Sequence, residues 1–141
     1  MWSWGGPVFR KRACKVYALD CFPRQLRVVK AKATKERLSN IEVILSDLET
    51  GLPDESVDVV WMCDVFHEVR QKRAVLEELR RVLKKDGVLA IHDGMGERVL
   101  NYTDGLFSLN DKQGNLLQFV KTSGCQRYDE EECKHPVVQI R

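Results

Sequence analysis

Short apolar runs alternate with stretches of helical periodicity between Lys15 and Asp93. This alternation is typical of strands connected by helices, and such connections favour a parallel sheet. The run at 57–63 is nearly all apolar, as expected for a strand that is covered on both faces. The predicted strands of this part of the chain are 15–20, 41–45, 57–63 and 88–93.

Two segments carry apolar residues at spacings of three and four, which predicts two helices. The first covers residues 23–37, because proline at its start suits the first turn of a helix. Its apolar stripe consists of Leu26, Val29 and Ala33. The second covers residues 69–83. Residues 84–87 predict its end, since lysines favour the C-terminal dipole and glycine often follows the last turn.

The chain beyond Asp93 shows weaker periodicity. Residues 106–109 and 116–120 are short alternating segments around a polar loop with a glycine, which predicts an antiparallel hairpin. Residues 122–141 show no clear period and are interpreted as a C-terminal tail. We therefore predict one domain over residues 1–121, followed by this tail.

Composition narrows the class of protein. A chain of 141 residues with 43% hydrophobic residues fits one small soluble domain. Its formal charge of +2 comes from interleaved bases and acids, which argues against a nucleic-acid binder. No apolar run approaches the roughly 18 residues that span a bilayer, and no signal peptide is recognised, so we expect no membrane contact and a cytoplasmic location. The 5 cysteines include no C-x-x-C pair and are interpreted as reduced thiols.

The order of elements resembles that of the class I S-adenosylmethionine-dependent methyltransferases. Val16-Tyr-Ala-Leu-Asp20 is similar to that family's second strand, which ends on an acid, and residues 79–93 are similar to its helix, glycine turn and fifth strand. The resemblance covers residues 15–120. It implies an α/β fold with a Rossmann-like, doubly wound, mostly parallel sheet and a C-terminal antiparallel hairpin.

The same resemblance implies S-adenosylmethionine as cofactor and a set of binding residues. Asp20 matches the acid that accepts hydrogen bonds from the ribose hydroxyls. Asp47 and Leu48 match the adenine-binding loop after the third strand. Cys63 matches the end of the fourth strand, beside the methionine part of the cofactor. Ligands bind near the carboxyl ends of such strands, where all four residues are expected.

The chain departs from the family at its beginning. The family's first strand and Gly-rich turn should precede Asp20, but only adjacent Gly5 and Gly6 are found there, and Gly6 lies 14 residues before Asp20. That strand occupies the centre of the family's sheet, between the second and fourth strands. Residues 1–4 could fill the place, the second and fourth strands could pair directly, or another chain could supply a strand. An open place predicts self-association through exposed strand edges.

These features favour a methyltransferase that acts on an unknown small-molecule acceptor, with no catalytic residue assigned. The alternative is an inactive fragment or interaction module that binds no cofactor. A nicotinamide-dinucleotide protein is a third reading, since it also carries an acid after its second strand. No metal site is predicted: His67 and Glu68 beside Asp64 are interpreted as a helix start. Cys125, Cys133 and His135 lack the spacing of a zinc site.

Overall fold

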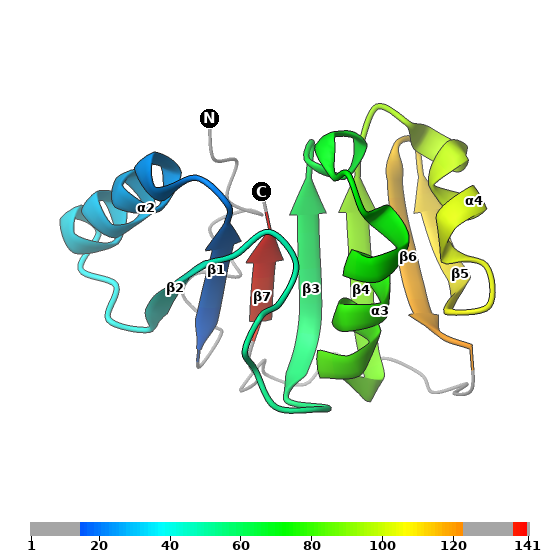
Figure 1. Cartoon of the computed structure of the whole chain (residues 1–141), viewed down its shortest axis with the longest axis horizontal. Helices are drawn as coiled ribbons and strands as arrows, with labels where there is room; N and C mark the ends of the chain where they lie inside the picture. The colour runs from blue at the N-terminus through cyan, green and yellow to red at the C-terminus, as the bar shows by residue number, and fades with distance from the viewer. Residues whose placement is uncertain (1–14, 123–136, 141) are drawn as a thin grey trace.

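The computed structural model describes residues 15–122 and 137–140. Within these residues, seven strands form a single sheet in the order β2-β1-β7-β3-β4-β6-β5 (Figure 1). The strands are β1 (Val16–Asp20), β2 (Ile41–Leu45), β3 (Val57–Cys63), β4 (Leu83–His92), β5 (Phe107–Gln113), β6 (Leu116–Lys121) and β7 (Val137–Ile140). The first five strands in this order, β2, β1, β7, β3 and β4, are all parallel to their neighbours. Strand β6 runs antiparallel to both of its neighbours, β4 and β5. The predicted mostly parallel α/β fold is confirmed.

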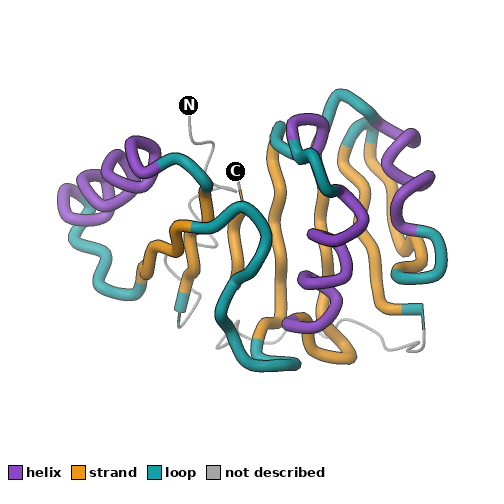
Figure 2. The backbone as a smooth tube through the Cα atoms, viewed as in Figure 1, coloured by secondary structure: helices purple, strands orange, loops and turns teal. Residues whose placement is uncertain are grey.

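The helices lie against the sheet (Figure 2), and their buried residues form two separate clusters. They are α2 (Pro23–Lys35), α3 (Lys72–Val82) and α4 (Leu100–Thr103), with 3-10 turns η1 (Phe66–Glu68) and η2 (Gly96–Val99). The larger core joins α3 to the sheet through buried residues such as Leu76, Val60 and Met62. A smaller cluster joins Val29 of α2 to Ala18 on the other face of β1. Successive residues of a strand therefore pack into the two clusters alternately, because their side chains point to opposite faces of the sheet.

Helix α2 follows the sequence prediction closely. It begins at Pro23, and its buried residues are Leu26, Val29 and Ala33. The helix ends at Lys35, two residues before the predicted end. Arg37 has a φ of 55°, in the left-handed region, and the chain leaves the helix there.

Helix α3 also ends early, at Val82, and Leu83 already belongs to β4. Residues 84–87 lie within β4, opposite an irregularity in its pairing with β3, instead of closing a helix. A Cβ on Gly87 would lie 2.6 Å from Cγ of Leu83 and 3.0 Å from the backbone oxygen of Asp58. Gly87 is therefore required by close packing between β3 and β4, and not by a helix end.

The central position of the sheet, between β1 and β3, is occupied by β7. This strand pairs in parallel with both neighbours, so that Ile140 lies level with Leu19 on one side and Met62 on the other. Of the alternatives left open by the sequence, direct pairing of the second and fourth family strands is excluded. The expectation of a tail is corrected, because residues 137–140 form a strand inside the sheet. Four residues are too few to give a periodic signal, and their place depends on pairing with distant strands. Residues 1–4 lie outside the described part of the chain.

Strand β7 fills the place in the sheet whose expected vacancy led to the prediction of self-association. The open central place that motivated this expectation is not found, since β7 pairs on both sides. Self-association stays a prediction, and the strand edges left unpaired within the described sheet belong to β2 and β5. The predicted hairpin is confirmed as β5 and β6, with longer strands than expected and a shorter connection around Gly114.

Candidate functional site

The parallel strands end along one edge of the sheet, and the residues predicted to bind a cofactor gather there. Asp20 ends β1 and Cys63 ends β3, while Asp47 and Leu48 belong to the loop that follows β2. The backbone N–H of Ser46 donates to the backbone oxygen of Asp20 at 3.1 Å, which holds this loop against the end of β1. The fold thus brings all four residues to one edge.

Asp20 is buried, with 3% of its surface exposed. Its Oδ1 accepts a hydrogen bond of 2.9 Å from the backbone N–H of Phe22, which orients the carboxylate. Its Oδ2 is also buried, but it has no hydrogen-bond partner among the described residues. A buried carboxylate oxygen without a partner is costly, and a hydroxyl donor of a ligand would relieve that cost. Asp20 therefore fits the ribose of the implied cofactor.

Asp47 is exposed and Leu48 is half-buried at the border of the larger core. The hydroxyl of Ser46 accepts a hydrogen bond from the backbone N–H of Leu48 at 3.3 Å, which tightens the turn between them. Burial, followed by the charge of Asp20 and to a smaller extent that of Asp47, raises the pKa of the nearby Cys21 thiol. The carboxylates of Asp20 and Asp47 therefore both lie near Cys21, the residue that follows β1.

Glu78 of α3 anchors the far end of this loop. Its Oε1 accepts hydrogen bonds from the backbone N–H and the hydroxyl of Thr50, at 3.0 and 2.7 Å. Arg81 donates to both oxygens of Glu78 and also to Asp54. The sequence analysis missed this anchor, because residues 50 and 78 are far apart in the chain and carry no shared motif.

Cys63 at the end of β3 lies level with Asp20 at the end of β1, and strand β7 lies between them. The pairing of Ile140 with Leu19 and with Met62 fixes this relationship. Neighbouring strands are spaced by roughly 4.8 Å, so the two strand ends are about 10 Å apart. That distance suits two contacts with different parts of one extended ligand.

His67 lies beside the same edge in the short 3-10 turn η1, and not at the start of the predicted helix, since α3 begins only at Lys72. Its Nδ1–H donates to Oδ2 of Asp93 at 3.0 Å, and its backbone N–H donates to the same oxygen at 3.1 Å. Burial disfavours the charged form of Asp93, but hydrogen bonds from Met95 and His67 outweigh it and lower the pKa of this carboxyl. The carboxylate of Asp93 therefore fixes the orientation of the ring, and Nε2 lies 3.8 Å from Oε1 of Glu68. The sequence analysis did not identify Asp93 as the partner of His67.

Comparison with known proteins identifies the family of the chain. A family model described as a methyltransferase domain matches residues 6–91, which is more than half of the chain. The chain belongs to the class I methyltransferase family. The family and the solved structures that the chain resembles are S-adenosylmethionine-dependent, so the family implies that cofactor for this chain.

Solved structures show the same fold. An S-adenosylmethionine-dependent methyltransferase of Aquifex aeolicus is 26% identical with a TM-score of 0.67, and the match covers 77% of this chain and 69% of that one. A protein of Pyrococcus horikoshii is 17% identical with a TM-score of 0.65, over 77% and 74% of the two chains. Its likeness supports the fold alone.

A curated relative is the (S)-coclaurine N-methyltransferase of Thalictrum flavum subsp. glaucum. It is 25% identical over 77 residues, which are 55% of this methyltransferase-family chain and 21% of the plant enzyme. The chain therefore spans about a fifth of that relative. Separately, none of the helices described here is long and apolar enough to cross a membrane.

Proposed function

We propose that this chain binds S-adenosylmethionine and transfers its methyl group to a small-molecule acceptor. The observation that carries the proposal is the buried Oδ2 of Asp20, which lies at the end of β1 without a partner among the described residues. A carboxylate at this place accepts hydrogen bonds from ribose hydroxyls. Membership in the methyltransferase family supports the same ligand.

Each residue at the edge has a distinct role in the proposal. Asp20 holds the ribose, the loop of Asp47 and Leu48 receives the adenine, and Cys63 borders the methionine part. The cofactor supplies a sulfonium methyl group that a nucleophile can displace. Positioning is the chief task of the protein in such a displacement, because donor and acceptor must be close and aligned. The rigid strand ends are suited to that task.

Isothermal titration with S-adenosylmethionine and S-adenosylhomocysteine tests the proposal, with NAD as a third ligand. We expect the first two to bind and NAD not to bind. Asp20→Ala should weaken binding by about 1.5 to 3 kcal/mol, or roughly 10- to 150-fold, the range for hydrogen bonds to a charged group. The matched control is Asp111→Ala, which removes an exposed aspartate on β5 at the edge of the sheet.

Two results would contradict the proposal in different ways. Unchanged affinity in Asp20→Ala would remove the ribose assignment while leaving cofactor binding intact. Failure of the folded wild-type chain to bind either compound would favour the alternative, an inactive fragment or interaction module. Selective binding of NAD would instead favour a dinucleotide-binding protein.

The acceptor is proposed only as a small molecule. The plant relative is an N-methyltransferase by name, and that name motivates amines as the first acceptors to screen. A cytoplasmic location and the absence of nucleic-acid partners stay predictions from the sequence. They do not affect the binding experiment.

A further inference from the structure

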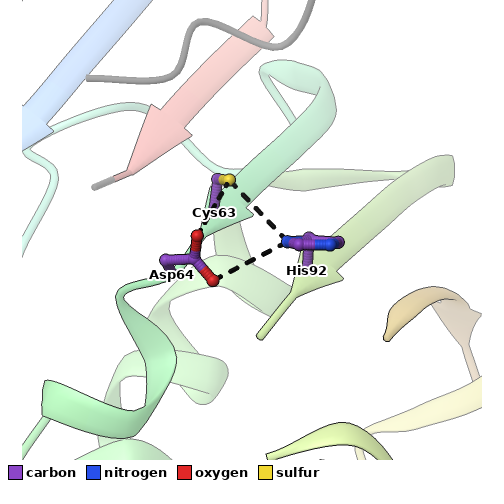
Figure 3. A group of neighbouring side chains, drawn as sticks. All are labelled: Cys63, Asp64 and His92. Carbon is purple, nitrogen blue, oxygen red and sulfur yellow. Dashed lines mark hydrogen bonds and ion pairs between the residues drawn. The ribbon is translucent and has the colours of Figure 1, made fainter. Parts of the chain in front are cut away.

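Three side chains with metal-binding atoms meet at the ends of β3 and β4. Cys63 and His92 are paired in register on the two adjacent parallel strands, so their side chains lie next to each other on one face of the sheet. Asp64 follows Cys63 directly, and its backbone N–H donates to the backbone oxygen of His92 at 2.8 Å. Asp64 has a φ of 53°, and its side chain turns back toward the other two (Figure 3).

Each pair of these side chains has polar atoms 3.7 to 4.0 Å apart, and Asp64 approaches Cys63 and His92 with different oxygens. The Sγ of Cys63 lies 3.9 Å from Nδ1 of His92 and 4.0 Å from Oδ2 of Asp64. The Oδ1 of Asp64 lies 3.7 Å from Nδ1 of His92, which is longer than a hydrogen bond between nitrogen and oxygen. The contact between Asp64 and His92 is therefore at the distance of an ion pair and not of a hydrogen bond.

These distances are close to those of a tetrahedral metal site. With bonds of about 2.0 to 2.3 Å, zinc holds sulfur, nitrogen and oxygen ligands about 3.3 to 3.6 Å apart. One donor atom from each of Cys63, Asp64 and His92 lies within 4.8 Å of the other two, so the most distant pair would have to approach by up to about 1 Å to hold one ion. We propose that Cys63, Asp64 and His92 form a binding site for a zinc-class divalent cation.

The donor types determine which cation is expected. Thiolate and imidazole ligands suit zinc and cobalt, whereas magnesium and calcium take oxygen ligands. The side chains of His92 and Asp64 are 44% and 67% exposed, so an ion can enter from solvent. Three protein ligands leave a fourth position open, as in catalytic zinc sites, for water or for a donor atom of another ligand.

A nucleophilic Cys-His-Asp triad explains the cluster less well. In a triad the nucleophile and the acid contact different ring nitrogens of the histidine. Here Cys63 and Asp64 both approach Nδ1 of His92. Convergence on one point is the property that a metal site requires. The sequence gives no sign of this cluster, because residues 63 and 92 meet only through strand pairing.

The test uses the purified full chain, freed of metal and kept reduced, with Co²⁺ as the probe. We expect one equivalent to bind and to give a sulfur-to-cobalt charge-transfer band together with visible bands typical of tetrahedral cobalt. Zn²⁺ should displace it. Cys63→Ser should remove the charge-transfer band. His92→Ala and Asp64→Asn should weaken Co²⁺ binding by at least about 10- to 100-fold, the range found even for outer partners of metal ligands.

The chain has 5 cysteines, so a control at a cysteine away from the cluster is essential. Cys21→Ser changes the exposed cysteine that follows β1 and should leave Co²⁺ binding unchanged. Circular dichroism establishes that each variant is folded, and should Cys63→Ser fail to fold, His92→Ala carries the test. An unchanged spectrum in Cys63→Ser, unchanged affinity in His92→Ala, or no binding by the folded wild-type chain would overturn the site. The readout needs no methyl donor, so it is independent of the proposed function.

Discussion

Glu78 and Thr50 join helix α3 to the loop that leaves β2. One carboxylate oxygen of Glu78 accepts both the backbone N–H and the hydroxyl of Thr50, at 3.0 and 2.7 Å. The side chain of Glu78 is only 13% exposed. Because this loop also contains Asp47 and Leu48, the contact stabilises the fold and one wall of the proposed cofactor site together.

Glu78→Gln should destabilise the chain at neutral pH. The hydrogen bond from Arg81, with further hydrogen bonds from Thr50, lowers the pKa of Glu78 to about 2. A carboxyl whose pKa is lower in the folded state stabilises that state above its unfolded pKa, and this contribution is lost as pH falls toward 2. We expect Glu78→Gln to cost on the order of 2 kcal/mol at pH 7 and less at pH 3, measured by urea unfolding.

Glu77→Gln is the matched control. Glu77 is the preceding residue, but its side chain is 60% exposed and pairs with Arg73 only at 3.6 Å. An exposed pair of this kind contributes about 0 to 1 kcal/mol. Equal effects of the two substitutions at pH 7 would show that the Thr50 anchor adds nothing beyond a surface charge.

Asp93→Asn should also destabilise the chain above about pH 4. The Asp93 side chain is fully buried and accepts hydrogen bonds from Met95 and His67. Its lowered pKa means that its stabilising contribution is present at neutral pH and falls as pH drops below its unfolded value. We expect a cost of about 1 to 3 kcal/mol in chemical unfolding at pH 7, since a buried hydrogen-bond network is interrupted. The difference from wild type should shrink at pH 3, and a constant difference would contradict the charge argument.

Gly87→Ala tests the close contact between β3 and β4. The added Cβ would clash with Leu83 at 2.6 Å and press against the backbone oxygen of Asp58 at 3.0 Å. We expect a loss of about 1 to 3 kcal/mol in the free energy of unfolding, as for other overpacked sites. Gly94→Ala has nothing within 4 Å of its added Cβ and should change stability by less than about 0.5 kcal/mol. Similar values for the two variants would contradict the packing argument.

The sequence predicted those parts of the fold that depend on local patterns. Pro23 and the stripe that includes Val29 are sufficient to place α2, and the apolar run of β3 identifies a buried strand. The end of α3 was placed too late because Leu83 continues the helical spacing. Tertiary pairing with Val57 overrides that spacing and draws Leu83 into β4.

The candidate site was predictable only where a family motif marks it. Asp20 is the last residue of β1 and Asp47 lies two residues after β2, and the fold brings them to the same edge. Two other contacts join residues more than twenty positions apart. Asp93 contacts His67, and Cys63 pairs with His92. Such contacts depend on strand order and register, which a single sequence does not specify.

The strongest departure from the sequence prediction is β7, and Val138 tests it. Val138 is fully buried and lies between Tyr17 of β1 and Val60 of β3 in the register of the sheet. Val138→Asp would place a charge in the core, so we expect the free energy of unfolding to fall by about 3 to 5 kcal/mol, or the chain to unfold completely. Circular dichroism and urea titration measure this effect. Leu109→Asp is the control, because Leu109 lies on edge strand β5 and is 42% exposed. If β7 holds the centre of the sheet, only the first substitution is severe, and equally mild effects would mean that another segment occupies that place.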